Sequence, residues 1–121
     1  MYPIKRNRRL RSSEAVRSMV REQQLSPTDL IVPLFAVEGS DVKEEIASMP
    51  DYYRMSLDYL KKEVQELWSM GLKTVLLFVK VPDTLKDNKG TEALNPEGLM
   101  QRAIALVKET VPEMVVMTDV A

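Results

Sequence analysis

Three unbroken apolar segments alternate with two amphipathic helical patterns, and this order limits the possible folds more than any other feature of the sequence. We expect strands near residues 30–37, 74–81 and 114–120, so successive strands begin about 40 residues apart. Strands that are apolar at every position are typical of parallel sheets covered on both faces. Pro33 suits an edge or bulge position of the first strand, because proline cannot donate to a strand ladder. The sequence therefore predicts an α/β protein with a parallel sheet and right-handed crossovers.

Helix start and stop signals place the two crossover helices. Ser56 is a good N-cap for the first helix, and Gly71 is placed to end it. Residues 95–97 begin the second helix with an asparagine N-cap, a proline and an early acidic residue, and Pro112 ends it. Residues 38–55 are expected to form a polar connection between the first strand and the first crossover helix.

The N-terminal segment differs from the rest of the chain in its charge. Residues 1–11 lack periodicity and are expected to form an extended arm, followed by a short helix from Ser13 to about Glu22. Residues 1–21 carry a net charge of +6, whereas the whole chain carries −1. Such a basic segment can bind nucleic acid, be disordered or contact another subunit. Because Tyr2 is its only aromatic residue and no nucleic-acid motif follows, we favour subunit contact or disorder and expect no nucleic-acid partner.

Two architectures fit the predicted elements: a Rossmann-like open sheet and a (β/α)8 barrel. No G-x-G-x-x-G or phosphate-binding loop follows any strand, which weakens the dinucleotide-binding alternative. Three parallel strands alone would leave residues 114–120 as a flat hydrophobic edge, whereas further units of this length would close a barrel. We therefore expect a truncated chain. It holds an arm with a short helix at 1–25 and the first three strands of a (β/α)8 TIM barrel at 26–121.

The residue types that are missing restrict the chemistry. The chain of 121 residues contains no cysteine and no histidine. It therefore holds no disulfide, no Ser-His-Asp or Cys-His nucleophilic site and no zinc site built from cysteine and histidine. Carboxylates, lysines, hydroxyls and a hard metal ion on oxygen ligands remain. The apolar segments are too short to cross a bilayer and no apolar core follows the N-terminal basic residues, so we expect a cytoplasmic protein without membrane contact.

Asp119 is the candidate catalytic residue. It lies near the end of the third predicted strand (114–120), and the C-terminal ends of strands are where parallel α/β proteins assemble their active sites. A carboxylate at that end can orient an ammonium group or take part in proton transfer. The alternative is a structural aspartate that caps a helix or bonds a loop.

Five segments, in order and with matching spacing, resemble one enzyme family across essentially the whole chain. They are residues 8–11 (RRLR), 30–39 (LIVPLFAVEG), 46–50 (IASMP), 86–93 (KDNKGTEA) and 118–121 (TDVA). Together they resemble porphobilinogen synthase, also called 5-aminolevulinate dehydratase. The resemblance implies a (β/α)8 barrel preceded by an arm that wraps a neighbouring subunit, usually in a homo-octamer. The implied reaction condenses two molecules of 5-aminolevulinate to porphobilinogen, with loss of water, in tetrapyrrole (heme) biosynthesis.

The resemblance also implies roles for single residues. Asp119 matches an active-site aspartate of the family. Ala121 stands where zinc-dependent relatives have the first of three cysteine ligands, so the sequence resembles the branch that uses aspartates and magnesium, or no active-site metal. The family's two Schiff-base lysines come from later barrel strands, and Lys80 and Lys86 do not match their motifs. Within this chain we therefore expect Asp119 as the catalytic residue, with no cofactor-binding residue and no metal ligand.

Two functional hypotheses follow from these observations. The first is the N-terminal part of a porphobilinogen synthase, which lacks dehydratase activity on its own because the Schiff-base lysines lie in the missing part. The second is a non-catalytic α/β binding or assembly module that keeps the enzyme's scaffold.

Overall fold

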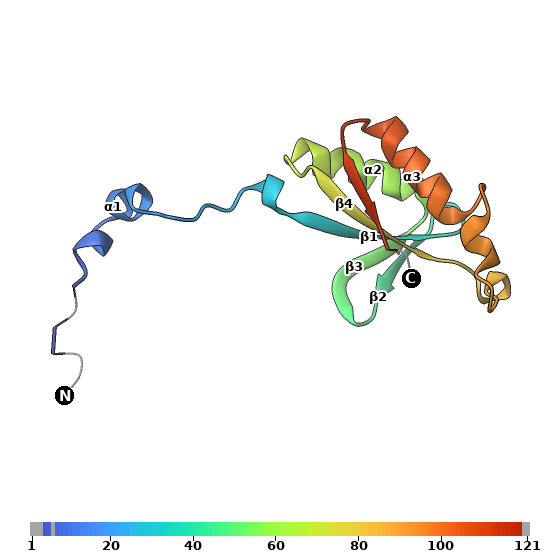
Figure 1. Cartoon of the computed structure of the whole chain (residues 1–121), viewed down its shortest axis with the longest axis horizontal. Helices are drawn as coiled ribbons and strands as arrows, with labels where there is room; N and C mark the ends of the chain where they lie inside the picture. Colours follow the sequence, from blue (N-terminus) through green and yellow to red (C-terminus); the bar gives the residue numbers. More distant parts are fainter. Residues whose placement is uncertain (1–3, 6, 120–121) are drawn as a thin grey trace.

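A mixed five-stranded sheet forms the centre of the computed structural model, which describes residues 4–5 and 7–119 (Figure 1). The strand order is β2-β3-β1-β4-β5. The strands are β1 (Ile31–Val37), β2 (Lys43–Ile46), β3 (Met49–Met55), β4 (Thr74–Lys80) and β5 (Val115–Thr118).

β1, β4 and β5 correspond to the three apolar segments, and they lie side by side and parallel. β4 aligns with the whole of β1, ending with Val37 beside Lys80. β5 begins with Val115 beside Thr74. The predicted parallel arrangement of these three strands is confirmed, with limits within a few residues of those expected.

The β2–β3 hairpin shows that the expectation of a polar connection at residues 38–55 is wrong. β2 and β3 pair antiparallel, and β3 also pairs in parallel with the end of β1 at Phe35 and Ala36. Ile46 and Met55 are the only residues of these two strands that are buried. β2 is mostly charged and the apolar residues of β3 do not alternate with polar ones, so the hairpin lacks the pattern by which strands are detected in a sequence.

Pro33 lies in the interior of β1, at a point where the ladder to β3 has not begun. That ladder includes only Phe35 and Ala36 of β1. The Tyr52 hydroxyl donates instead to the carbonyl oxygen of Pro33. Pro33 therefore sits on a stretch of β1 that behaves as an edge toward β3, which is the environment that the sequence predicts for it.

The helices follow the predicted pattern, with differences at their ends. They are α1 (Glu14–Met19), α2 (Leu57–Ser69) and α3 (Leu99–Thr110), with 3-10 helices η1 (Arg9–Arg11), η2 (Pro27–Asp29), η3 (Asp83–Leu85) and η4 (Thr91–Leu94). α1 stops short of Glu22. α2 ends before Gly71, whose φ of 93° suits the predicted role of ending the helix.

α3 begins after Gly98 and not at residues 95–97. The Asn95 side chain accepts from the Glu97 N–H at 3.0 Å and closes a separate turn before the helix. No helix in the described ranges is long and apolar enough to cross a membrane.

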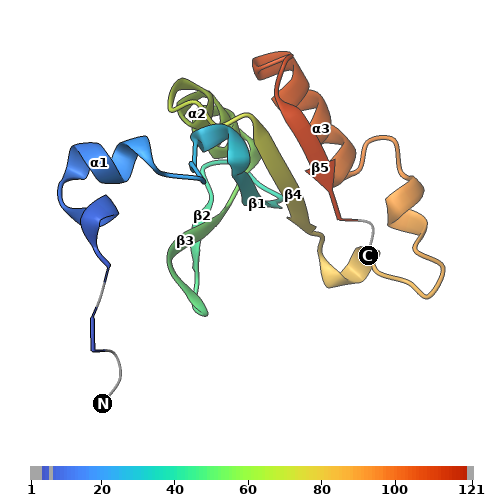
Figure 2. The ribbon, with the colours of Figure 1, turned by 60° about the vertical axis from the view of Figure 1, so that its left-hand side comes forward.

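α2 and α3 pack against the same face of the sheet (Figure 2). Their apolar stripes meet the side chains that β1 and β4 direct to that face. The shared core contains Leu34, Ala36, Leu60, Val64, Val75, Leu77, Ala103, Val107 and Met114. Each large side chain buried in this way stabilises the fold by about 1.5–3 kcal/mol relative to exposure. This face of the sheet has a complete hydrophobic core.

The N-terminal arm extends away from the sheet (Figure 1). α1 has no buried residue, and Leu10, Met19 and Leu25 are 61, 80 and 78% exposed. Ser13 caps α1 by accepting from the Val16 N–H at 3.2 Å, as its position in the sequence predicts. The short helix is confirmed, although it ends at Met19. Of the expected extended arm at residues 1–11, residues 9–11 form the 3-10 helix η1, and residues 1–3 and 6 lie outside the described residues. The domain division at residue 25 stays a prediction.

Candidate functional site

The sheet face opposite α2 and α3, here called the open face, carries the candidate site. Successive side chains of a strand point to opposite faces. Since Leu34, Ala36, Val75 and Leu77 pack against the helices, the residues between them belong to the open face. The open face comprises Ile31, Pro33, Phe35, Leu76, Phe78, Lys80, Val115, Met117 and, by the same alternation, Asp119.

Much of the open face is apolar and in contact with solvent. Ile31 and Val115 are each 52% exposed, and Met117 is 42% exposed. These residues come from β1 and from β5, so the apolar surface extends across the parallel part of the sheet. Contiguous apolar surface of this kind marks a region that binds a ligand or is covered by another segment or protein.

An aromatic cluster lies between the apolar surface and the hairpin. The rings of Phe35 and Phe78 stack with centroids 5.1 Å apart, and Tyr52 meets Phe35 edge-on at 6.0 Å. Burial, and secondarily the negative charge of Glu63, raise the pKa of the Tyr52 hydroxyl above its ordinary value. Tyr52 is therefore a neutral hydrogen-bond donor across the physiological pH range, and it ties β3 to β1.

Asp119 comes directly after β5 and is exposed at the carboxyl end of the strand. Thr118 lies beside Leu77 on β4, so the next pair along the strands is Asp119 and Phe78. Among the described residues, the Asp119 carboxylate caps no helix and accepts no loop hydrogen bond. Its catalytic role stays a prediction, and its side chain is exposed at this end of the sheet.

The carboxyl ends of β1 and β4 enclose a shallow recess of about 250 Å³. Its lining includes Val37, Glu38, Glu44 and Lys80. The Glu38 carboxylate accepts from the Arg102 guanidinium, which also donates to the Glu97 carbonyl oxygen at 2.9 Å. This contact joins the end of β1 to the beginning of α3, and it holds one of the residues that line the recess.

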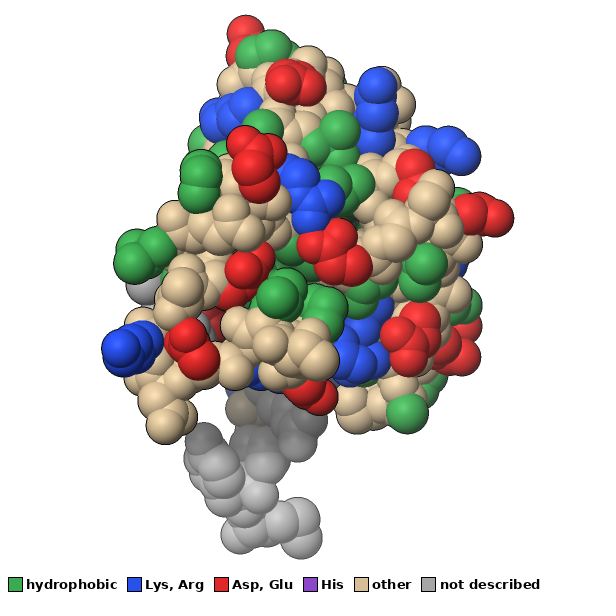
Figure 3. All heavy atoms as spheres, turned by 90° about the vertical axis from the view of Figure 1, so that its right-hand side faces the viewer, with side chains coloured by type: hydrophobic (Ala, Val, Ile, Leu, Met, Phe, Trp, Pro, Cys, Tyr) green, Lys and Arg blue, Asp and Glu red, His purple; other side chains and the backbone are tan. Residues whose placement is uncertain are grey.

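The loop after β4 is charged and bonds largely to itself. The Lys86 ammonium donates to the Asp83 carboxylate at 2.6 Å, and the Asp87 carboxylate accepts from the N–H groups of Lys89 and Thr91 at 3.0 Å each. Its hydrogen bond from the Thr91 hydroxyl is the main cause of a lowered Asp87 pKa. Figure 3 shows this end of the molecule, where acidic and basic side chains intermingle with hydrophobic ones.

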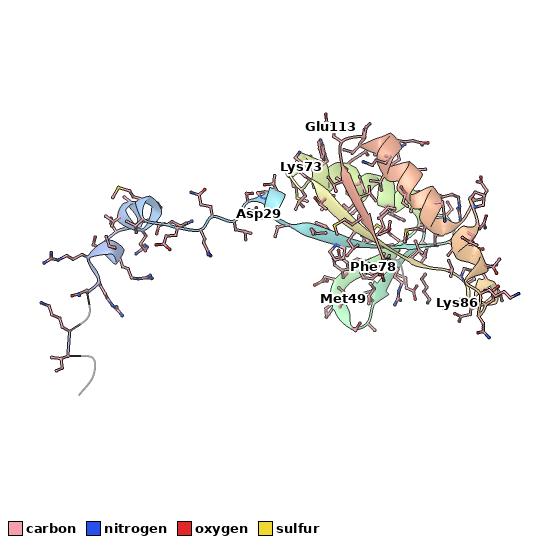
Figure 4. The ribbon with its side chains drawn as sticks, in the orientation of Figure 1. Asp29, Met49, Lys73, Phe78, Lys86 and Glu113 are labelled. Carbon is pink, nitrogen blue, oxygen red and sulfur yellow. The ribbon has the colours of Figure 1, made fainter. Side chains whose placement is uncertain are left out.

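Figure 4 shows which residues lie at each of the two ends of the sheet. Lys73 and Glu113 lie at the end where β4 and β5 begin, and Lys86 lies beyond the opposite end. Asp119 and the recess belong to that opposite end, where parallel α/β proteins place their active sites. The predicted site residue thus lies on the expected side of the sheet.

The described residues contain no group of three or more acidic residues, histidines or cysteines arranged to hold a metal ion. Ala121, on which the expectation about zinc rests, lies outside the described residues. The metal preference therefore remains a prediction from the sequence.

Sequence reasoning missed residues at the end of the sheet that also carries Asp119. Lys80, Glu38 and Arg102 line or brace the recess, yet none was selected. Alternation along β4 was a usable signal for Lys80, because it places Lys80 on the same face as Phe78. Glu38 and Arg102 are 64 residues apart, so no local pattern could join them.

Comparison with known proteins now gives the family. The family model of delta-aminolevulinic acid dehydratase matches residues 4–121. The chain belongs to the delta-aminolevulinic acid dehydratase family. The family resemblance found in the sequence is thereby confirmed.

Similar members of this family come from several bacteria. The Bacillus subtilis (strain 168) enzyme is 48% identical over 114 residues, which cover 94% of this chain and 35% of the relative. The Synechococcus elongatus enzyme is 46% identical over 119 residues, covering 98% of this chain and 36% of the relative. The chain thus spans about a third of the length of these relatives.

A solved structure of the family matches the fold described above. It is delta-aminolevulinic acid dehydratase (porphobilinogen synthase) from Toxoplasma gondii ME49 in complex with the reaction product porphobilinogen. The TM-score is 0.91 at 43% identity, with 100% of this chain and 34% of that chain covered. The five-stranded sheet and its helices are therefore part of the architecture of this family, and the family match does not favour the non-catalytic module.

Proposed function

We propose that this chain is the N-terminal part of a porphobilinogen synthase, which condenses two molecules of 5-aminolevulinate to porphobilinogen with loss of water. The observation that carries the proposal is the family match over residues 4–121, together with a TM-score of 0.91 to a family member. The chain spans about a third of its relatives, so most reacting groups belong to the remaining two thirds of the enzyme.

β1, β4 and β5 are, in this proposal, the first three strands of a (β/α)8 barrel. Two features support this. The open face is apolar and exposed, as the interior face of an incomplete barrel would be, and barrel interiors are filled by layers of side chains. β5 is the last strand of the sheet and offers an unpaired hydrophobic edge to a following parallel strand.

The residues of this chain would bind, orient and shield the substrate. Lysines of the remaining part form Schiff bases with the substrate ketones, as the family resemblance implies. Asp119, at the mouth of the barrel, orients the ammonium group of a substrate molecule or takes up a proton. The stacked rings of Phe35 and Phe78 lie on the same face and exclude water beneath the reacting groups, which strengthens electrostatic interactions there.

The remaining expectations concern the complete enzyme. We propose that the complete enzyme uses magnesium and has no three-cysteine zinc site. The described residues provide no set of three metal donors, so Asp119 acts in this proposal as a carboxylate without a metal-dependent step. We also propose a cytoplasmic homo-oligomer, such as an octamer, in which the arm binds a neighbouring subunit and neither nucleic acid nor membrane is a partner. The exposed Leu10, Met19 and Leu25 support the arm's role, because burial against another subunit would remove them from water.

A chimeric enzyme tests the proposed function. Residues 1–121 replace the matching segment of the Bacillus subtilis relative, and porphobilinogen formation from 5-aminolevulinate is measured. We expect the chimera to form porphobilinogen and residues 1–121 alone to form none. The Bacillus enzyme without its matching segment is the control, and it should be inactive.

Two results would contradict the proposal. Porphobilinogen formation by residues 1–121 alone would show that the catalytic groups are assigned to the wrong part of the enzyme. A chimera that folds and assembles like the Bacillus enzyme but forms no porphobilinogen would show that this chain does not serve as that part.

A further inference from the structure

Tyr52 of β3 connects the β2–β3 hairpin to the aromatic cluster of the open face. Its hydroxyl donates to the carbonyl oxygen of Pro33, and its ring meets Phe35 edge-on. The ladder between β1 and β3 includes only Phe35 and Ala36, so it does not reach Pro33. Tyr52 therefore extends the attachment of β3 to β1 beyond the ladder.

The same side chain begins a row of contacts that crosses the open face. The Tyr52 ring centroid lies 6.0 Å from that of Phe35, which stacks on Phe78 at 5.1 Å. Phe35 and Phe78 are also partners in the register of β1 and β4. The register of β4 and β5 places Phe78 level with Asp119. The row thus leads from the hairpin to the strand end that carries the predicted catalytic residue.

The orientation of the Phe35 ring is set by both of its aromatic neighbours. The plane of Phe78 is tilted by only 15° from that of Phe35, whereas the plane of Tyr52 stands at 89° to it. Stacked and edge-on contacts of this kind favour a defined mutual orientation of the rings. All three rings are half-buried, so the close packing that fixes the covered face acts on them less strongly. The hydrogen bond of Tyr52 therefore anchors the row at its hairpin end.

We infer that Tyr52 is a positioning residue for the proposed reaction: it holds Phe35, and through it Phe78, in the orientation that forms the floor beside Asp119. This inference rests on the proposed function, and Tyr52 itself contacts no reacting atom. Rings that turn out of this orientation would admit water and let the substrate shift relative to the Asp119 carboxylate. Small displacements of reacting groups lower the rate strongly, so Tyr52 should affect kcat more than KM.

The test uses the chimeric enzyme with Tyr52→Phe, and with Tyr53→Phe as a matched control. Alternation turns Tyr53 to the other face of β3, where the Lys43 ammonium lies 4.6 Å from its ring centroid. Within the described part of the chain, the Tyr53 hydroxyl forms no hydrogen bond. Loss of one neutral hydrogen bond corresponds to about fivefold in rate. We expect Tyr52→Phe to lower kcat by about this factor with KM changed less than about twofold. Tyr53→Phe should leave both unchanged.

A double-mutant cycle with Phe78→Leu separates positioning from a general structural role. If Tyr52 acts through the rings, Tyr52→Phe should lower kcat by less than about twofold in a chimera that already carries Phe78→Leu, because the ring that it orients is gone. An equal loss in both backgrounds would mean that Tyr52 acts elsewhere, and it overturns the inference.

A spectroscopic measurement serves if Tyr52→Phe does not fold. A ring-fluorinated tyrosine at position 52 keeps the ring and the hydroxyl, and its fluorine resonance should shift when Phe78→Leu is introduced. The same label at position 53 should not shift. An unshifted resonance at position 52, or an active chimera whose kcat is unchanged by Tyr52→Phe, overturns this inference alone. An inactive unmodified chimera overturns the proposed function instead.

Discussion

The two faces of the sheet differ, although the same strands build them. On the covered face, Leu34, Val75 and Leu77 are almost fully buried beneath α2 and α3. On the open face, Ile31 and Met117 remain about half exposed. The covered face therefore supplies stability within this chain, whereas apolar side chains of the open face remain in contact with solvent in the described structure. We expect substitutions on the covered face to change folding, and substitutions at the rim of the open face to change catalysis.

The largest expected effect is the loss of activity on replacing Asp119. In the chimeric enzyme, Asp119→Asn should lower kcat/KM by about 100-fold or more, because a positioned acid–base or ammonium-binding carboxylate is lost. Steady-state kinetics provides the measurement. Asp51→Asn, at an exposed position of β3, is the matched control and should leave the activity unchanged. Equal activity of the two variants would leave Asp119 with a structural role only.

The second effect concerns the stability contributed by each face. Leu77→Ala should destabilise the chimera by about 2–5 kcal/mol, because it leaves a cavity beneath the helices. Met117→Ala should also cost at least about 2 kcal/mol in the chimera, since the open face becomes the barrel interior there. Urea unfolding measures both changes. If Met117→Ala changes the free energy of unfolding of the chimera by less than about 0.5 kcal/mol, the open face stays in contact with solvent.

A smaller effect is expected from the contact that braces the recess. Arg102→Gln removes the ion pair with Glu38 and weakens the bond to the Glu97 carbonyl oxygen. Because both charged side chains are partly exposed, we expect a loss of about 1 kcal/mol or less in the same urea experiment. Arg17→Gln, which breaks an ion pair within the arm, is the control and should not change the stability of the barrel. Equal free energies of unfolding for the two variants would show that the contact between Arg102 and Glu38 does not stabilise the fold.

The smallest effect concerns the loop after β4 at low pH. The Thr91 hydroxyl and N–H lower the Asp87 pKa from its ordinary value of 3.8. The loop is therefore stabilised by ionised Asp87 at every pH above 3.8, and this contribution disappears as the pH falls through the lower folded-state pKa. NMR titration of the Asp87 carboxyl should give a midpoint below 3.8, and Asp87→Asn should abolish the accompanying shift of the Thr91 amide. A midpoint at or above 3.8 would contradict this hydrogen-bonded loop.

The sequence was sufficient for the parts of the fold that have a continuous apolar run. β1, β4 and β5 each contain such a run, and α2 has a regular apolar stripe followed by Gly71, so local patterns determined them. The β2–β3 hairpin could not be detected, because its stability comes from pairing with the end of β1 and not from an apolar pattern of its own.

The candidate site was predictable in its location but not in its details. Asp119 follows from the rule that parallel sheets place chemistry at the carboxyl ends of their strands. The pairing of Glu38 with Arg102 depends on how α3 returns to β1, and two residues so distant in the sequence show no common signal. Only tertiary structure reveals that Lys80 lines the same recess as Glu38 and Glu44.

Amide hydrogen exchange along β5 tests most directly whether the sheet continues into a longer barrel. The Val115 N–H donates to the Lys73 carbonyl at 2.9 Å, so alternation turns the amides of Val116 and Thr118 to the outer edge. We predict fast exchange of these two amides in residues 1–121 and slow exchange in the chimeric enzyme, with Val115 protected in both. Equally fast exchange of Val116 and Thr118 in both proteins would contradict the account, because the sheet would then end at β5.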